Sequence, residues 1–491
     1  MPGFPLGYDK FKPFVFAQVI FSKFLDMLPA NNSNQIKHLY SRAAFGISYP
    51  KLQKVSGWSR RRVVSQLFTD SEKWEELQFP GSVFSGQELK SISSLNEEDK
   101  KERIRTARHN VRLLNIAWLE KMSSTDALLR EKLTLFWHGH FACRSANPVF
   151  LQQLNNVHRK YALGDFRTML LEVSRSPAML QFLNNQQNRR GKPNENFARE
   201  LMELFTLGRG NYTEKDIKEA ARAFTGWGYN QKGEYQFRPV LHDDATKIFF
   251  GKNGHFDGTD IIDQILEKPQ AANFIARKLY AFLVSDTVDE ARIKELGAHF
   301  YKSKYDISEL LKKILTADWF YESKLIGGKI KSPVELLVGL NRQFNVSYQN
   351  PAVLLNFQSA LGQVLFYPPN VAGWPGGRNW IDSSSLMIRL KIPSLILNAG
   401  IIDFDGKADI EDEAEIAFIR VKLQIMERQV RATAGWEQFL AGFPQKTKIE
   451  DLAVFLLQPP ISTAALKNLQ NNNGLKSVAI ELLSLPEYQM C

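Results

Sequence analysis

Apolar residues recur at three- and four-residue spacing along most of the chain, which is the period of an amphipathic helix. The clearest such segments are 165–183, 196–207, 215–224 and 271–284. Gly208 follows the second segment as a helix-ending C′ residue, and Thr213 with Asp216 forms a variant of the capping box before the third. The pattern therefore predicts a mainly α fold, a multi-helix globular body.

One segment has the two-residue period of a strand. Tyr235, Phe237 and Leu241 lie at even spacing, and a second short apolar run follows at 247–250. The residues between them, 242–244, are typical of a turn. We expect a small β-hairpin inserted in the helical body, with a plain loop as the alternative.

The length of the chain, 491 residues, exceeds that of a single hydrophobic core, so two or three packed parts are expected. A polar stretch at 85–101 and an acidic, Gly-containing stretch at 403–415 mark the expected boundaries. The predicted division is an N-terminal helical segment and linker (1–100), a main helical body (101–400) and a C-terminal helical segment (401–491).

Composition narrows the class of protein. Hydrophobic residues make up 44% and charged residues 23%, which is ordinary for a globular protein. The formal charge of +11 is spread along the chain, and its densest clusters, 60–62 and 189–190, are short. No nucleic-acid-binding module is recognisable, so we expect a basic solvated surface and no nucleic-acid partner. Two cysteines, Cys143 and Cys491, imply neither a disulfide framework nor a cysteine-built metal site.

The N-terminal region loosely suggests a signal peptide. An apolar run at 14–28 follows Lys10 and Lys12, but Lys23 and Asp26 interrupt it and no small-x-small cleavage site follows. No other stretch approaches the ~20 apolar residues that span a bilayer. We expect a soluble protein with no transmembrane segment, and the compartment stays open.

The segment FWHGHF places His138 and His140 two residues apart. On a strand both imidazoles would point to the same side, as metal ligands require, whereas on a regular helix they would diverge by about 200°. The preceding residues suggest an amphipathic helix, so we expect both histidines at or just beyond its end. The alternative is that local hydrogen bonds satisfy both rings.

The segment NENFARELMELFTLG would carry a polar stripe on one helix face, formed by Asn196, Arg199, Glu200 and Glu203. Two carboxylates at i and i+3 could supply metal ligands or a general acid and base. The alternative is an exposed stripe with an internal Glu–Arg salt bridge.

Further candidates lie on predicted turns and loops. His242 and Asp243 at the predicted hairpin turn could bind a metal, orient a proton-transfer group or cap the turn. Trp227 follows the helix ending at FTG, and the rigid loop PPNVAGWPGGRNW displays Trp374 and Trp380. Planar aromatic side chains on such a loop suit stacking on sugar rings, and buried anchors of the loop are the alternative.

These segments also carry a resemblance to the bacterial family catalogued as domain of unknown function 1800. The matching blocks are 38–46, 129–141, 164–184, 194–208, 212–227, 241–251, 331–337 and 368–377. The family pattern keeps residues matching His138, His140, 194–201, His242 with Asp243 and Lys247, and Trp374. One departure is that 244–246 read Asp-Ala-Thr where the family usually has Gly soon after the His-Asp.

The resemblance implies a helix-rich protein whose relatives are often exported, to the periplasm or cell envelope. They are commonly encoded beside a sulfatase-like family, which implies a sulfatase-like protein as a partner. The weak N-terminal signal is a second departure and weakens the implication of export.

Three functions remain open. The leading one is a metal-dependent hydrolase of an envelope-associated ester or glycan. Its predicted zinc or manganese ligands are His138, His140 and His242, its catalytic residues are Glu200, Glu203, Arg199, Asp243 and Lys247, and its substrate-binding residues are Asn196, Trp227, Trp374 and Trp380. The alternatives are a metal-free glycan-active enzyme that uses the paired Glu residues, and a non-catalytic binding or assembly protein of the envelope.

Overall fold

The protein is described by a computed structural model that covers residues 32–78, 96–230, 232–398, 430–469 and 474–491. The first helices are α2 (Asn32–Ala43), α3 (Tyr49–Val55), α4 (Arg60–Asp70), α5 (Glu97–Ser124), α6 (Leu128–His140), α7 (Pro148–Tyr161), α8 (Phe166–Arg175) and α9 (Pro177–Phe182). The next are α10 (Asn196–Glu200), α11 (Glu214–Ala223), α12 (Gly258–Leu266), α13 (Pro269–Leu283), α14 (Glu290–Lys302), α15 (Ile307–Thr316), α16 (Pro333–Phe344), α17 (Val353–Leu361) and α18 (Ser383–Leu397). The last are α20 (Trp436–Ala441), α21 (Ile449–Leu456), α22 (Thr463–Leu469) and α23 (Leu475–Leu483).

Short helical turns and strands connect these helices. The turns are η2 (Asn185–Gln187), the π-helical η3 (Leu201–Thr206), η4 (Pro239–Leu241), η5 (Asp318–Tyr321), η6 (Gly377–Trp380) and η8 (Pro486–Gln489). The strands are β1 (Trp227–Tyr229), β2 (Tyr235–Phe237), β3 (Lys247–Phe249), β4 (Lys252–Gly254), β5 (Ser347–Tyr348) and β6 (Ala432–Thr433). The described residues therefore form a mainly α fold with small antiparallel hairpins, as the helical periodicity predicts.

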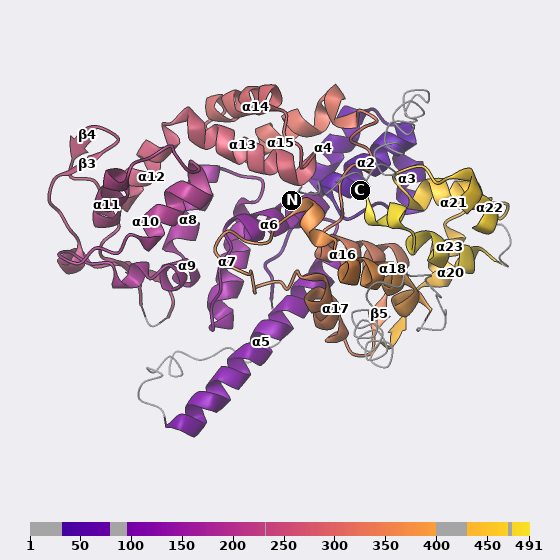
Figure 1. The fold of residues 1–491 in the computed structure, drawn as a ribbon, viewed down its shortest axis with the longest axis horizontal. Coiled ribbons are helices and arrows are strands. Elements are labelled where there is room, and N and C mark those ends of the chain that lie inside the picture. The colour runs from indigo at the N-terminus through magenta and orange to yellow at the C-terminus, as the bar shows by residue number, and fades with distance from the viewer. Residues whose placement is uncertain (1–31, 79–95, 231, 399–429, 470–473) are drawn as a thin grey trace, which may run out of the picture.

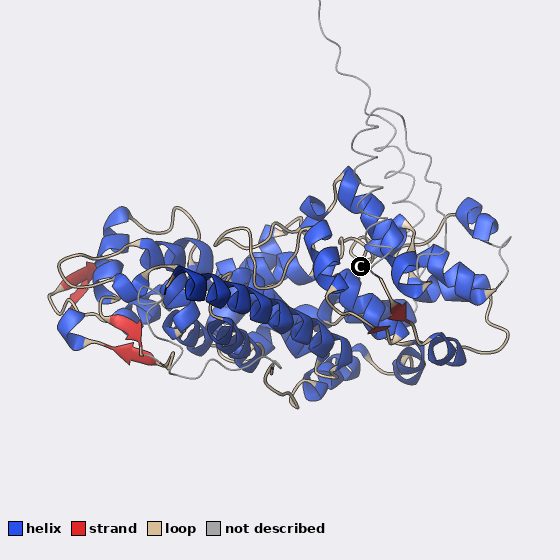
Figure 2. Ribbon diagram, turned by 90° about the horizontal axis from the view of Figure 1, so that it is seen from below, coloured by secondary structure: helices blue, strands red, loops and turns tan. Residues whose placement is uncertain are grey.

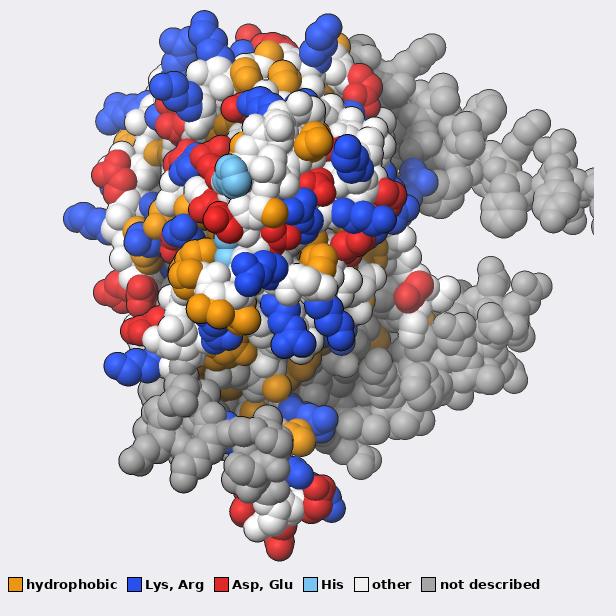
Figure 3. Space-filling model, turned by 90° about the vertical axis from the view of Figure 1, so that its left-hand side faces the viewer, with side chains coloured by type: hydrophobic (Ala, Val, Ile, Leu, Met, Phe, Trp, Pro, Cys, Tyr) orange, Lys and Arg blue, Asp and Glu red, His pale blue; other side chains and the backbone are white. Residues whose placement is uncertain are grey.

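The molecule is elongated, as Figure 1 shows. Helices α8 to α12 and the hairpin β3–β4 lie at one end, helices α20 to α23 lie at the other, and α6 lies between them. One half of α5 stands away from the body, and Figure 2 shows the same helix running along one side. Figure 3 shows Lys and Arg interleaved with Asp and Glu over the end that carries the β3–β4 hairpin.

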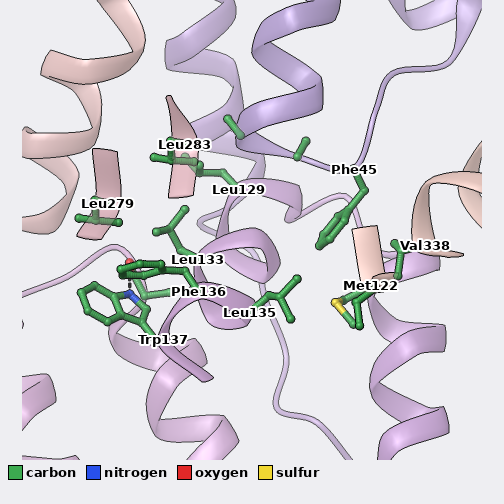
Figure 4. Close-up of a cluster of buried hydrophobic side chains, with 14 of the residues drawn as sticks. Phe45, Met122, Leu129, Leu133, Leu135, Phe136, Trp137, Leu279, Leu283 and Val338 are labelled. Carbon is green, nitrogen blue, oxygen red and sulfur yellow. Dashed lines mark hydrogen bonds between the residues drawn. The ribbon is translucent and has the colours of Figure 1, made fainter. Parts of the chain in front are cut away.

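Helix α6 is the centre of the core. Leu129, Leu133 and Trp137 are fully buried, and Figure 4 shows them among side chains of α5, α13 and α16. Burial of each large apolar side chain contributes about 1.5–3 kcal/mol to folding. The indole Nε1 of Trp137 donates a hydrogen bond to the carbonyl of Ala162 at 3.3 Å, so its one polar atom is satisfied. This packing fixes the position of the two histidines that end α6.

Two local predictions of helix ends are confirmed. Thr213 and Asp216 form a reciprocal capping box at the start of α11. Gly208 has φ +80°, a conformation that glycine adopts without a steric penalty, and its N–H bonds to the carbonyl of Met202 at 3.0 Å.

Two predicted helices differ from the structure. The segment 165–183 is divided into α8 and α9, because Ser176 is extended and caps a new helix that starts at Pro177. The segment 196–207 begins as α10 and continues as the π-turn η3, in which the chain is wound more loosely than in an α-helix.

The predicted pairing of strands was wrong. β2 pairs with β1 and β3 pairs with β4, so the region holds two hairpins instead of one. The residues 239–241 form the turn η4, because Pro239 cannot donate a ladder hydrogen bond.

The predicted domain division stays a prediction. Residues 97–101 begin α5 and are not part of a linker, whereas 85–95 and the acidic stretch 403–415 lie outside the described residues, as does the apolar run 14–28. Across the described ranges, none of the helices is long and apolar enough to cross a membrane. Cys143 and Cys491 are both free and buried.

Candidate functional site

His138 and His140 both lie in the last turn of α6, because this helix continues through residue 140. This agrees with the expected position at the end of the helix, and on a helix the two rings diverge instead of pointing to one side. His138 Nε2 accepts a hydrogen bond from the N–H of Phe366 at 3.1 Å. His140 Nε2 lies 3.1 Å from the carbonyl oxygen of Phe205 in η3 and must donate to it. The two rings therefore form hydrogen bonds with different segments of the chain.

Both histidines are neutral at physiological pH. Burial lowers the pKa of His138 to about 3 and, together with the nearby charge of Lys278, lowers that of His140 to about 3. His138 also packs edge-on against Trp118, with ring centroids 5.0 Å apart, and contacts Trp374 at 5.4 Å.

A cavity of about 240 Å³ lies beside His140. Its walls come from α6, η3, α13, the start of α16 and the loop that leads into η6. Its lining includes Phe136, Gly139, His140, Leu204, Lys278, Phe282, Asp286, Lys329, Ser332, Glu335, Gln363, Trp374, Gly377 and Trp380. The predicted loop at 368–380 therefore does frame a cavity.

Two glycines bring the tryptophan loop against α6. Gly373 has φ +82°, and a Cβ built on it would lie 2.3 Å from the carbonyl oxygen of Gly139. Gly139 is the residue between the two histidines, so the loop backbone rests directly on the end of α6. This contact sets Trp374, which is half-buried, and Trp380, which is 7% exposed, along one side of the cavity.

Two ion pairs include residues that line the cavity, namely Lys329–Asp286 and Lys132–Glu335, in which only Glu335 of the second pair is a lining residue. Lys329 Nζ donates to Asp286 at 2.5 Å and to the carbonyl of Ala281 at 2.8 Å. Lys132 Nζ pairs with Glu335, which also accepts the N–H of Ser332 at 2.7 Å as part of the capping box of α16. The Lys132 charge and the Ser332 hydrogen bonds lower the pKa of the Glu335 carboxyl against the opposing effect of burial.

Lys278 has no such partner. Within the described residues no acidic side chain lies within ion-pair distance of its ammonium group, which sits 5.4 Å from the ring centroid of Phe274. Burial lowers its pKa. Lys278 therefore presents to the cavity a positive charge that no described carboxylate offsets.

The predicted carboxylate pair does not line this cavity. Glu203 is held by Arg209 at 2.5 Å and by the hydroxyl of Tyr212 at 3.0 Å, and these bonds lower its pKa. The pKa of Glu200 is raised by burial and by the charge of Glu203. Their neighbour Leu204 is the residue of this turn that lines the cavity.

The other members of that stripe are also outside the cavity. Arg199 forms a two-pronged ion pair with Glu214, at 2.8 and 2.9 Å, and a third contact with Glu195 at 3.1 Å. Asn196 is exposed. The ion pairs of this stripe join Arg199 to Glu195 and Glu214, and Glu203 to Arg209, so among the described residues their partners lie outside the stripe.

The His242 segment forms a turn that is held by hydrogen bonds within the turn and to neighbouring residues before it in the chain. His242 Nδ1 lies 2.9 Å from the carbonyl of Thr225, and Asp243 pairs with Arg222 at 2.8 and 3.3 Å. Lys247 is fully buried and donates to the carbonyls of Asp243 at 2.6 Å and Ala245 at 3.1 Å. These bonds give the turn a structural role.

Trp227 is 2% exposed and lies between Phe224 and Tyr235, with ring centroids 5.0 and 5.3 Å away. A buried ring of this kind offers no face to a ligand. Trp227 therefore belongs to the core of the β1–β2 region and not to the cavity.

Of the predicted site residues, the structure brings His140, Trp374 and Trp380 together around one cavity, with His138 behind Trp374. His138, His140 and His242 do not converge, and the described ranges contain no group of three or more His, Cys, Asp or Glu side chains that could hold a metal ion. These residues do not fit the expected zinc or manganese site, so we derive no step through a metal.

Sequence reasoning missed the charged lining of the cavity, formed by Lys278, Asp286, Lys329 and Glu335. The sequence does contain a pattern that points to Glu335, because Ser332 and Glu335 have the spacing of a capping box within the block 331–337. No sequence pattern points to Lys278, since a lone lysine in an amphipathic segment usually lies on the solvated face.

A family model described as "Protein of unknown function (DUF1800)" matches residues 38–490. No curated protein and no solved structure matches the chain. The chain therefore belongs to the DUF1800 family, and the described fold is a mainly helical example of it.

Proposed function

We propose that the cavity beside His140 binds a carbohydrate that carries an anionic group. The observation that supports this most strongly is the convergence of Trp374, Trp380 and the unpaired Lys278 on one cavity of about 240 Å³. A cavity of this size accommodates part of a ligand, such as one sugar ring with its substituent.

The aromatic residues supply the apolar contact. A sugar ring has one face formed mainly by C–H groups, and such a face packs on an indole ring. Trp374 is half-buried, so part of its side chain remains accessible, whereas Trp380 is largely buried. Phe136 and Phe282, whose centroids are 5.2 Å apart, extend the apolar wall.

The charged residues supply the polar contacts. No described carboxylate lies within ion-pair distance of the Lys278 ammonium, so an anionic group on the ligand would form a charge-assisted hydrogen bond with it. Asp286 and Glu335 are already paired with lysines, so their remaining lone pairs can accept hydrogen bonds from sugar hydroxyls.

The same residues could support hydrolysis of an ester or glycosidic bond in that ligand. Asp286 and Glu335 are paired with lysine cations, so either would act as a base or nucleophile. Lys278, whose pKa burial lowers, would be the proton donor. This assignment replaces Glu200 and Glu203 of the predicted metal-free enzyme, and the cavity alone supports binding more directly than turnover.

A thermal-shift screen tests the proposal, with uronic acids, sugar sulfates and sugar phosphates compared with the parent neutral sugars. We expect saturable stabilisation by members of the anionic set, and its loss in Trp374→Ala. Trp58→Ala is the matched control, because Trp58 packs under Arg62 outside the cavity. Equal responses of both variants, or stabilisation by neutral sugars alone, would contradict the proposal. Binding without product formation would favour the non-catalytic role.

A further inference from the structure

A second, smaller cavity lies behind Glu335. Its volume is about 60 Å³, and its lining includes Lys37, Phe45, Gly46, Lys132, Lys331, Glu335, Gln343 and Gln458. Its lining includes residues of the blocks 38–46 and 331–337, and of these only Glu335 enters the proposed function. The space holds a few water molecules or one small ion.

Three lysines from three elements reach this cavity. Lys37 of α2 is 4% exposed and Lys132 of α6 is 1% exposed, while Lys331 precedes α16. Glu335 is the one carboxylate among the described lining residues. The lining side chains therefore carry three positive charges and one negative charge, and the negative charge of Cys491 also acts on Lys331.

Backbone carbonyls hold the lysines in place without neutralising them. Lys37 donates to the carbonyls of Val454 and Leu457 at the end of α21. Lys331 donates to the carbonyl of Tyr488 at 2.6 Å, and its ammonium lies 3.6 Å from the centroid of the Tyr488 ring. Burial lowers the pKa of both Lys37 and Lys331 to about 8, so both remain mostly charged at pH 7.

Donor groups remain for a ligand. An ammonium has three N–H groups, and the hydrogen bonds of Lys37 within the described residues use two of them. Lys132 likewise uses two, on Glu335 and on the carbonyl of Ser41. Gln343 and Gln458 also line the cavity, and a glutamine side chain carries two N–H donors.

We propose that this cavity is a binding site for a small inorganic oxyanion of the phosphate and sulfate class. Such an anion offsets the excess charge and accepts hydrogen bonds from several directions at once, as the lysines and glutamines require. Because Glu335 also lines the larger cavity, the bound anion would share Lys132 with the carboxylate that faces the carbohydrate.

Calorimetry on the full chain tests this inference, with sodium sulfate and sodium phosphate titrated at constant ionic strength in an acetate buffer. We expect saturable binding of at least one anion with a dissociation constant of about 1 mM or lower. Lys37→Met should weaken this binding at least tenfold, and Lys331→Gln serves the same purpose if the first variant does not fold. Lys278→Met, which alters only the larger cavity, should leave it unchanged.

The outcomes separate this site from the carbohydrate site. No saturable heat from wild-type protein with either anion would overturn the inference. A stabilisation that rises linearly with sulfate and is equal in all variants is the general effect of an excluded salt and would also overturn it. Loss of anion binding in Lys278→Met, with retention in Lys37→Met, would place the anion in the larger cavity.

Discussion

The Nε2 of His140 lies 3.1 Å from the carbonyl oxygen of Phe205, so the last residue of α6 donates a hydrogen bond to the π-turn η3. This bond fixes the tautomer of His140, with the proton on Nε2. It also holds the turn in which Leu204 forms part of the cavity wall. His140 is therefore a positioning residue for the cavity.

The buried histidines predict a loss of stability in acid. The pKa of His138 and His140 is about 3 in the folded state and 6.5 in an unperturbed histidine. The unfolded state therefore binds more protons below pH 6.5, and the free energy of unfolding falls from there down to pH 3. The expected slope is up to about 1.4 kcal/mol per pH unit for each histidine.

Urea denaturation at several pH values between 7.5 and 5 measures this slope. His140→Gln should reduce the number of protons that the protein takes up on unfolding by up to one. The amide of glutamine can still donate to Phe205, so the variant separates the titration from the hydrogen bond. Imidazole NMR signals of His138 or His140 that titrate near pH 6.5 in the folded protein would contradict the prediction.

The contact between Gly373 and Gly139 predicts a contrast between two glycines of one loop. Gly373→Ala should destabilise the protein by roughly 1–3 kcal/mol, because its φ of +82° is strained for alanine and the methyl group would collide with the Gly139 carbonyl. Gly376→Ala should change stability by less than about 0.5 kcal/mol, since a Cβ there meets no atom within 4 Å. Chemical denaturation compares the two, and equal effects would show that the loop does not rest on α6.

The Lys132–Glu335 pair predicts strong coupling between two charges. Lys132 is 1% exposed, so Glu335→Gln should destabilise by about 3–5 kcal/mol by leaving its charge buried without a counter-charge. Combining it with Lys132→Met removes that charge and should recover much of the loss. A double-mutant cycle by urea denaturation measures the coupling, and additive effects would mean that the two side chains do not interact in solution.

The turn at His242 predicts a purely structural effect. Asp243→Asn weakens the two-pronged pair with Arg222 and should lower the free energy of unfolding by about 1 kcal/mol. Binding of an anionic carbohydrate should be unchanged, because Asp243 does not line the cavity. Calorimetry on the folded variant measures this carbohydrate binding. Loss of binding would show that Asp243 does contribute to the site.

Local signals in the sequence predicted much of the fold but little of the site. Helical periodicity, Gly208 and the Thr213–Asp216 box depend on neighbouring residues and could be interpreted directly. The π-turn at 201–206 has no such signal, and its residues contact α13 and accept the His140 hydrogen bond, both from distant segments.

The site depends on contacts between distant segments. Lys278 and Trp374 are almost a hundred residues apart, and their meeting follows from how α13 and the tryptophan loop both pack on α6. The sequence predicted both histidines at or just beyond the end of α6, and the structure places them in its last turn, where their rings diverge.

The most direct test of the account is whether Lys278 recognises the charge of the ligand. Calorimetry would measure the best anionic sugar from the screen and its uncharged counterpart, such as a uronic acid and its methyl ester. Wild type, Lys278→Met and the control Lys302→Met, a lysine that does not line the cavity, would be compared. We predict that the acid binds Lys278→Met at least about tenfold more weakly, whereas the uncharged form binds all three proteins alike. Equal binding of the acid to wild type and Lys278→Met would contradict the central claim.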